Sequence, residues 1–236
     1  MFAFTIRRII QAILVMLVIS FIGFAVQYSI GDPVRDMVGI RVSAAEREAL
    51  REKLGLNDSF WIQYSRFVRN ATRGDLGTSY FYSKPALQVI LQKAPATLEL
   101  VFVTAMIIVL VSLPVGIYTA INPKKLFSKI TMGISTVGVS FPVFLTAIGL
   151  IYLFAVELHW LPSYGRGATV NIGGWETGFL TKDGLLHLIL PSIALSSIML
   201  PLFIRLIRAE MMEVLETEYI KYAWAKGLSR RRVWLL

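Results

Sequence analysis

Side chains that commonly carry out chemistry are scarce in this sequence. It contains no cysteine and only two histidines, His159 and His187, so thiolate chemistry is excluded and a multi-histidine metal centre is not expected. The H-E-x-x-H motif of zinc proteases, the Gly-Lys phosphate loop and the G-x-S-x-G elbow of esterases are all absent. We therefore predict no catalytic residue, no metal site and no cofactor, and we do not expect the chain to be an enzyme.

Ionisable residues are rare inside the long apolar stretches, and Glu99, near one end of such a stretch, is the exception. Because a charge at membrane depth is costly, Glu99 is a candidate for lining a polar pathway. Pro142 interrupts a second stretch and is the other pathway candidate, since proline kinks a spanning helix. The competing interpretation, which we favour for Glu99, is that it snorkels or caps its own helix. For Pro142, the competing interpretation is that the proline only shapes the packing of the helices.

The most informative polar segment is the last one, Arg208–Leu236. Its apolar residues recur at helical spacing, which predicts an amphipathic helix that ends at Gly227, with Ser229 starting another. The residues of the predicted apolar face are Met212, Leu215, Tyr219, Tyr222 and Ala223. The small residues Ala223 and Ala225 allow another backbone to approach closely. Such a helix lies on a membrane, packs under its own bundle or docks in the groove of a partner, and periodicity leaves all three open.

The elements that position these residues are apolar runs of membrane-spanning length. The sequence is 56% hydrophobic and 17% charged with a mean hydropathy of +0.64, whereas soluble domains have about 45–50% apolar and about 25% charged residues. A spanning helix needs about 20 mainly apolar residues. The runs that meet this length are Ile9–Ile30, Thr97–Ile121, Ile130–Val156 and Leu186–Ile204. We therefore predict an all-α integral membrane protein with four transmembrane helices, the first of which is too long for a cleaved signal peptide.

Basic residues mark one side of the membrane. The formal net charge is +9, and Lys and Arg recur before the first run, in the loop 122–129 and throughout 205–236. Short cytoplasmic loops retain positive charge, so the N-terminus and these segments are predicted to be cytoplasmic, and 31–96 and 157–185 extracytoplasmic. This pattern explains the basic surplus without a nucleic-acid partner.

The segment between the first two runs is predicted to fold as a small helical extracytoplasmic module. Ser43 and Glu46 have the spacing of a capping box, and the helix that they open stops at Gly55. A second helix is predicted from aromatic and apolar residues at helical spacing, namely Phe60, Trp61, Tyr64, Phe67 and Val68.

Several short motifs occur in a characteristic order. Tyr219–Leu228 reads Tyr-Ile-Lys-Tyr-Ala-Trp-Ala-Lys-Gly-Leu and is similar to the pattern Tyr-Ile-Arg-Thr-Ala-Arg-Ala-Lys-Gly-Leu, with departures at Lys221, Tyr222 and Trp224. The other matching segments are Arg7–Arg8, Gly31–Val34, Leu54–Leu56, Gln63–Tyr64, Gly74–Ser79, Ala96–Leu100, Ser140–Phe144, Leu161–Arg166 and His187–Pro191. Together they resemble the transmembrane permease subunits of bacterial ABC importers, in the dipeptide, oligopeptide and nickel branch. The Glu and first Ala of the general family signature, Glu-Ala-Ala-x-x-x-Gly, are replaced by Lys221 and Tyr222.

The resemblance implies a translocation pathway for di- or oligopeptides across the bacterial inner membrane. The implied partners are a second homologous permease subunit, two ATP-binding subunits that hydrolyse ATP, an extracytoplasmic substrate-binding protein and the lipid bilayer. The segment 209–227 is then expected to couple to the ATPase through Glu218, Tyr219, Ala223, Ala225, Lys226 and Gly227.

The resemblance also gives a domain division. It comprises an N-terminal transmembrane helix (1–30), an extracytoplasmic helical segment (31–95) and the permease transmembrane domain (96–236). Because the family normally has six spans, we expect this domain to be truncated after the coupling motif.

Two alternatives stay open at this level. One is an ABC permease for nickel or another small solute, because these share the permease pattern. The other is a membrane scaffold or channel that is not coupled to ATP. Dependence on ATP separates this second alternative from any importer.

Overall fold

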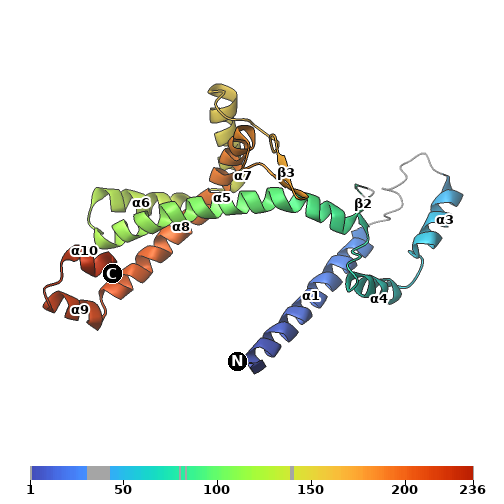
Figure 1. The fold of residues 1–236 in the computed structure, drawn as a ribbon, viewed down its shortest axis with the longest axis horizontal. Helices are drawn as coiled ribbons and strands as arrows, with labels where there is room; N and C mark the ends of the chain where they lie inside the picture. Colours follow the sequence, from blue (N-terminus) through green and yellow to red (C-terminus); the bar gives the residue numbers. More distant parts are fainter. Residues whose placement is uncertain (1, 31–42, 80, 83, 139–140, 236) are drawn as a thin grey trace. The chain divides into compact units, whose positions relative to one another are not determined.

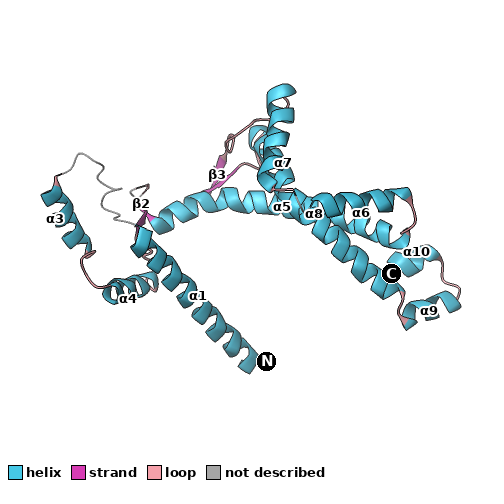
Figure 2. Ribbon diagram, turned by 180° about the vertical axis from the view of Figure 1, so that it is seen from behind, coloured by secondary structure: helices cyan, strands magenta, loops and turns pink. Residues whose placement is uncertain are grey.

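The computed structural model describes residues 2–30, 43–79, 81–82, 84–138 and 141–235. They fall into two compact units, Met1–Lys93 and Ala94–Leu236. Helices dominate both units, and within the described residues strands occur only as two short hairpins (Figure 1, Figure 2). The matched segment Gly31–Val34 and Ser140 lie outside the described residues.

The membrane-spanning prediction is confirmed in its main features. Among the described residues, three helices are long and apolar enough to cross a membrane, namely Phe2–Val26 within α1 (Phe2–Ile30), α5 (Ala86–Ile121) and α8 (Lys182–Leu215). A fourth span is formed by α6 (Leu126–Gly138) and α7 (Val143–Ile151) with η1 (Tyr152–Glu157), if this bent pair is one span. The all-α class and the predicted number of spans agree with this arrangement.

In the first unit, α4 (Phe60–Ala71) packs against α1 through aromatic rings. Phe21 and Phe24 of α1 each lie 5.5 Å from the Phe60 ring, measured between centroids. The Tyr64 hydroxyl donates to the Leu17 carbonyl oxygen at 3.0 Å. Aromatic pairs of this geometry contribute beyond the apolar area that they bury. The predicted apolar spacing therefore corresponds to a helix face that contacts the first span.

The helix α3 (Ala44–Leu54) begins and ends where the sequence predicts. The Ser43 side chain accepts a hydrogen bond from the Glu46 backbone N–H, and the Glu46 carboxylate accepts one from the Ser43 backbone N–H at 3.1 Å. Gly55 ends the helix at a φ of 64°, a left-handed conformation that glycine adopts without strain. Further along, β1 (Thr78–Ser79) and β2 (Lys84–Pro85) pair antiparallel just before α5.

In the second unit, α5 and α8 are longer than the apolar runs that predict them. α5 begins at Ala86 rather than Thr97, and α8 extends from Lys182 to Leu215 rather than from Leu186 to Ile204. Hydropathy marks where a helix is apolar, whereas its hydrogen-bonded ladder continues into polar sequence on either side. Both helices continue through internal prolines, Pro95 and Pro114 in α5 and Pro191 and Pro201 in α8.

The predicted run Ile130–Val156, which contains the kinking residue Pro142, forms two helical parts rather than one continuous helix. The chain bends by 107° between α6 and the α7–η1 pair. Pro142 is the N-cap residue of α7, a position where its missing N–H leaves no helical hydrogen bond unmade. In Figure 1, α6 follows the direction of α5 and α8, whereas α7 turns away from it.

Small polar residues line the buried side of the long helices. Ser112 and Thr119 of α5, Ser128 of α6, and Ser192 and Ser196 of α8 are almost completely buried. Gly116 lies where α5 approaches α8 closely, since a Cβ there would come 2.7 Å from Ile207 Cγ2. Small residues at membrane helix contacts allow such close approach of the backbones.

The polar ends of this unit carry the remaining elements. The hairpin of β3 (Val170–Ile172) and β4 (Trp175–Thr177) pairs Ile172 with Trp175 across a Gly173–Gly174 turn. Both turn glycines have positive φ, as the tight two-residue turn requires. After α8 the chain forms α9 (Glu218–Ala225) and α10 (Arg230–Leu235).

Candidate functional site

The candidate coupling residues are brought together on α9 and the turn that follows it. The helix begins after Thr217, whose backbone N–H and hydroxyl both donate to the Val214 carbonyl oxygen, at 3.1 and 2.6 Å. It ends in a left-handed turn at Gly227, which has a φ of 73°. The Leu228 N–H reaches back to the Ala223 carbonyl oxygen at 3.3 Å, as in a Schellman-type helix end. Both the stop at Gly227 and the new helix after Ser229 are therefore confirmed.

The prediction of one amphipathic helix through Met212 and Tyr222 is wrong. The helix α8 ends at Leu215, where the Thr217 N–H donates to the Val214 carbonyl oxygen. Met212 and Leu215 therefore belong to α8, whereas Tyr219 and Tyr222 belong to α9. The buried side of α9 is also different from the predicted apolar face. Ile220 is only 6% exposed, whereas Tyr219 and Tyr222 are 61% and 62% exposed.

The exposed surface of α9, which we call the coupling face, combines aromatic rings with charges. It consists of the candidate residues Glu218 and Tyr219, with Tyr222, Ala225 and Lys226. Glu218 accepts a salt-bridged hydrogen bond from Lys221 at 2.8 Å, and Lys226 Nζ lies 4.6 Å from the centre of the Tyr222 ring. Ala223 is partly buried beside this face. Tyrosine is enriched at protein–protein contact surfaces and is common among the residues that contribute most to binding.

Glu99 is buried at a junction between α5 and the hairpin segment. Its side chain is 4% exposed, and its Oε1 accepts a hydrogen bond from the Gly178 N–H at 2.9 Å. Its Oε2 lies 3.5 Å from Arg166 Nη2, which also donates to the Glu176 carbonyl oxygen at 2.5 Å. Glu99 therefore contacts residues far away in the sequence and does not act only on its own helix.

A second set of contacts ties the same segment to the start of α8. The Ala168 N–H donates to the Asp183 carboxylate at 2.7 Å, and the Thr181 hydroxyl donates to the Ala168 carbonyl oxygen at 2.5 Å. His187 Nδ1 lies 2.8 Å from the Asp183 carbonyl oxygen. The segment that carries the hairpin is thus held at both α5 and α8.

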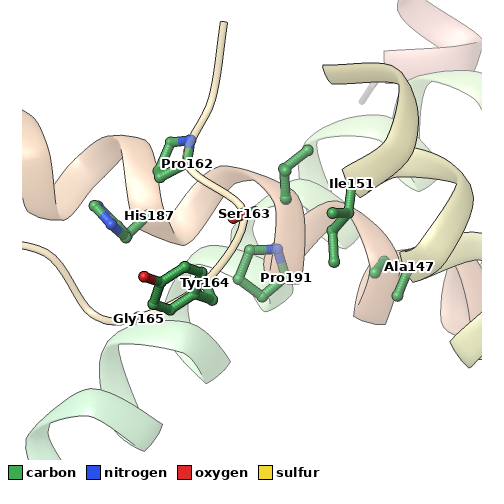
Figure 3. Close-up of a pocket in the computed structure, with 10 residues that line it drawn as sticks. Ala147, Ile151, Pro162, Ser163, Tyr164, Gly165, His187 and Pro191 are labelled. Atoms are coloured by element: carbon green, nitrogen blue, oxygen red, sulfur yellow. The ribbon is translucent and has the colours of Figure 1, made fainter. Parts of the chain in front are cut away.

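Pro142, the other pathway candidate, lies at the bend before α7 and is exposed. A cavity of about 210 Å³ lies further along α7, between that helix, the chain at Pro162–Gly165 and α8. In Figure 3, His187 and Pro191 border this cavity from α8, and Ala147 and Ile151 border it from α7. Its walls are mainly apolar, and Pro142 does not line it.

Sequence reasoning missed Arg166, Gly178 and Ile220. Arg166 belongs to a matched motif, Leu161–Arg166, but nothing local to it indicates its pairing with Glu99. The burial of Ile220 could have been predicted, because Ile220 is the aliphatic residue in a helix whose other large apolar side chains are aromatic.

Comparison with known proteins covers nearly the whole chain. Residues 112–236 match the family model described as the binding-protein-dependent transport system inner membrane component. Residues 1–101 match the N-terminal model of the same membrane component.

Curated relatives give the same picture. The chain is 33% identical to the dipeptide transport system permease protein DppB of Alkalihalophilus pseudofirmus, over 96% of this chain and 72% of that protein. It is 35% identical to the oligopeptide transport system permease protein AppB of Bacillus subtilis, over 99% and 72%. It is 30% identical to the glutathione transport system permease protein GsiC of Escherichia coli, over 97% and 70%.

With its apolar spanning helices and these matches, the chain belongs to the family of inner membrane components of binding-protein-dependent transport systems. It is therefore a membrane transport subunit.

Proposed function

We propose that this chain is a permease subunit of an ATP-driven importer of di- or oligopeptides. The observation that carries the proposal is the extent of the similarity. Two relatives named as dipeptide and oligopeptide permeases match over 96% and 99% of the chain, from α1 through the coupling face. The nickel alternative has no comparable support from these relatives, whose names refer to dipeptide, oligopeptide and glutathione transport.

The proposed complex contains a second homologous permease subunit, two ATP-binding subunits and an extracytoplasmic substrate-binding protein. The family description supports the binding protein, since it names transport that depends on one. The proposed topology places the N-terminus, the loop 122–129 and the coupling face in the cytoplasm, and the β3–β4 hairpin outside. The positive charge of 205–236 supports this orientation.

The coupling face is proposed to dock in a groove of an ATP-binding subunit. Its exposed tyrosines and small residues support this role, and the turn at Gly227 lets the chain leave the contact. Closure of the ATP-binding pair would then move α9 together with α8, as a rigid-body switch between access states. Such a switch requires that each nucleotide state favour one conformation.

The test is purification of the tagged chain from its native membranes in mild detergent, with mass spectrometry of the associated proteins. Co-purification of an ATP-binding subunit and a second permease is expected. After reconstitution of that complex with its binding protein into liposomes, ATP-dependent uptake of a radiolabelled dipeptide is expected, and uptake of Ni²⁺ is not. Uptake of Ni²⁺ without uptake of dipeptide would show that the complex is a nickel importer and not a peptide importer. Flux that does not depend on ATP would indicate a channel.

A further inference from the structure

The segment from Arg166 to Gly178 is fastened to α5 by a buried charge pair. Glu99 and Arg166 are 67 residues apart in the sequence, and Glu99 and Gly178 are 79 apart. The Glu99 carboxylate is 4% exposed and the Arg166 side chain 26%. Arg166 Nη1 also lies 3.5 Å from the Glu176 carboxylate. One arginine thus joins α5 to both the start of the segment and β4.

We propose that Glu99 and Arg166 form a positioning pair for transport. The pair holds the β3–β4 hairpin on α5, so that the hairpin moves with α5 and α8 when access changes and does not swing independently. This inference rests on the proposed function and topology, in which the hairpin lies at the extracytoplasmic mouth of the pathway.

The occupancy of the Glu99 carboxylate supports a positioning role over direct contact with substrate. One oxygen accepts the Gly178 N–H and the other faces Arg166. A buried carboxylate that already has a charged partner and a backbone donor has little free capacity for the ammonium group of a peptide. Its contacts go instead to the segment that carries the hairpin.

The energetics of buried pairs give the proposal a distinctive signature. Removing one member of a buried pair leaves an uncompensated charge, whereas removing both charges is often nearly neutral. Glu99→Gln keeps an oxygen that can accept the Gly178 N–H but no longer neutralises Arg166. Arg166→Met leaves the Glu99 carboxylate without its cation. The double variant removes both charges and keeps most of the side-chain volume.

The absence of cysteine in the sequence allows a direct readout of hairpin opening. Thr177 is 7% exposed, so a Thr177→Cys reporter reacts with a maleimide only when the hairpin opens. Ile172→Cys lies at an exposed position of the same hairpin and is the matched control for reagent access. The reporter is placed in the full chain, within its purified complex in lipid nanodiscs.

We expect Glu99→Gln and Arg166→Met each to accelerate labelling of the Thr177→Cys reporter by about tenfold or more. Arg166→Met leaves the buried Glu99 carboxylate without a cation, and Glu99→Gln leaves Arg166 with only the exposed Glu176 carboxylate, 3.5 Å away. The double variant should return the rate to near the unsubstituted value, and the Ile172→Cys control should not change. Unchanged labelling in both single variants would overturn the proposal. So would a double variant that is labelled as fast as Arg166→Met, because the effect would then be lost packing rather than charge.

Uptake by the reconstituted complex tests the consequence for transport. The single variants should lose at least about fivefold of ATP-driven dipeptide uptake, and the double variant should regain it. A purely space-filling role predicts instead that the double variant takes up no more dipeptide than Arg166→Met, because both variants lose the same side-chain volume at position 166. Normal uptake by single variants with an open hairpin would overturn the positioning role. If the unsubstituted complex takes up no dipeptide, the proposed function fails, and the labelling pattern still decides whether the pair holds the hairpin.

Discussion

Ala223 differs from the other candidate residues of the coupling segment, because its side chain is partly buried while its neighbours are exposed. The charged pair Glu218–Lys221 is exposed at both ends. A surface pair of this kind contributes little to stability, typically about 0–1 kcal/mol. Its charges therefore remain available to a partner, whereas a change at Ala223 acts on how closely the helix backbone can approach another surface.

We predict that Ala223→Glu reduces ATP-driven uptake at least tenfold, since a charge buried at a contact without a partner costs several kcal/mol, about 3–5 when a buried pair is broken. The measurement is dipeptide uptake by the reconstituted complex. Ala223→Ser is the matched control, because it adds one small hydroxyl, and should keep most of the uptake. Membrane insertion of both variants is checked by extraction with alkali. Normal uptake by inserted Ala223→Glu would contradict the coupling role of α9.

The cap of α3 predicts a pH effect. Hydrogen bonds from the Ser43 hydroxyl and then from the Ser43 backbone N–H lower the pKa of the Glu46 carboxyl below its ordinary 4.5. A carboxyl with a depressed pKa stabilises the folded helix above pH 4.5, and this stabilisation is lost as the pH falls through the lower folded-state value. Hydrogen-exchange protection factors of the α3 amides should therefore be constant from pH 7 to 5 and decrease below 4.5.

Glu46→Gln is the control for this pH effect. It keeps an acceptor at the capping position but removes the titration, so the protection of α3 should no longer change below pH 4.5. A pH dependence that survives in Glu46→Gln would assign the effect to another group.

At the scale of elements, two helical glycines offer a matched test of helix packing. A Cβ at Gly116 in α5 would lie 2.7–2.8 Å from the Ile207 side chain of α8 and 3.3 Å from the Ile204 carbonyl oxygen. A Cβ at Gly133 in α6 would have nothing within 4 Å. We predict that Gly116→Ala lowers stability by about 1–3 kcal/mol through overpacking. Gly133→Ala should be neutral or slightly stabilising, because alanine favours helix.

The readout for both glycine variants is the apparent unfolding temperature of the purified protein in detergent. We expect the unfolding temperature of Gly116→Ala to be lower than that of the unsubstituted chain, and that of Gly133→Ala to be equal or higher. Equal temperatures for the two variants would mean that α5 and α8 do not approach closely at Gly116 in the detergent-solubilised protein.

Substitutions of Gly227, at the end of α9, are expected to reduce uptake by different amounts. Gly227 has a φ of 73°, and a Cβ there would meet nothing within 4 Å, so a substitution costs only backbone strain. For alanine this is about 1–2 kcal/mol, whereas asparagine tolerates the left-handed region. Proline fixes φ near −65° and cannot form the turn. We predict that uptake by the reconstituted complex decreases in the order Gly, Asn, Ala, Pro, with Pro inactive. Uptake by an inserted Gly227→Pro variant would contradict a role for this turn.

At the scale of the whole molecule, the orientation of the spans is testable by labelling. Single cysteines can be introduced at four exposed positions of this cysteine-free chain, Ser65, Lys125, Ile172 and Lys221. A membrane-impermeant maleimide added to intact spheroplasts should label positions 65 and 172 only. Positions 125 and 221 should react after permeabilisation, because basic cytoplasmic loops resist translocation. Labelling of position 65 only after permeabilisation would invert the proposed topology.

The sequence determined the features that depend on residues close together in the chain. The apolar runs predicted the spanning helices, because partition into a membrane depends on the local sum of side-chain hydropathy. Ser43, Glu46 and Gly55 predicted the ends of α3, and Gly227 predicted the end of α9, because caps are formed within one helical turn. The short motifs likewise predicted the transport family that the comparisons show.

Only the tertiary structure decided the features that depend on distant contacts. Prolines at positions 114, 191 and 201 remain inside helices, whereas Pro142 begins a new one at a sharp bend. The residue type is the same, so packing around each site decides whether the helix continues. Glu99 in the same way looked like a lone charge in an apolar run, and its partner lies 67 residues away. A carboxylate takes the partner that the fold brings within hydrogen-bond distance, and local spacing carries no information about that residue.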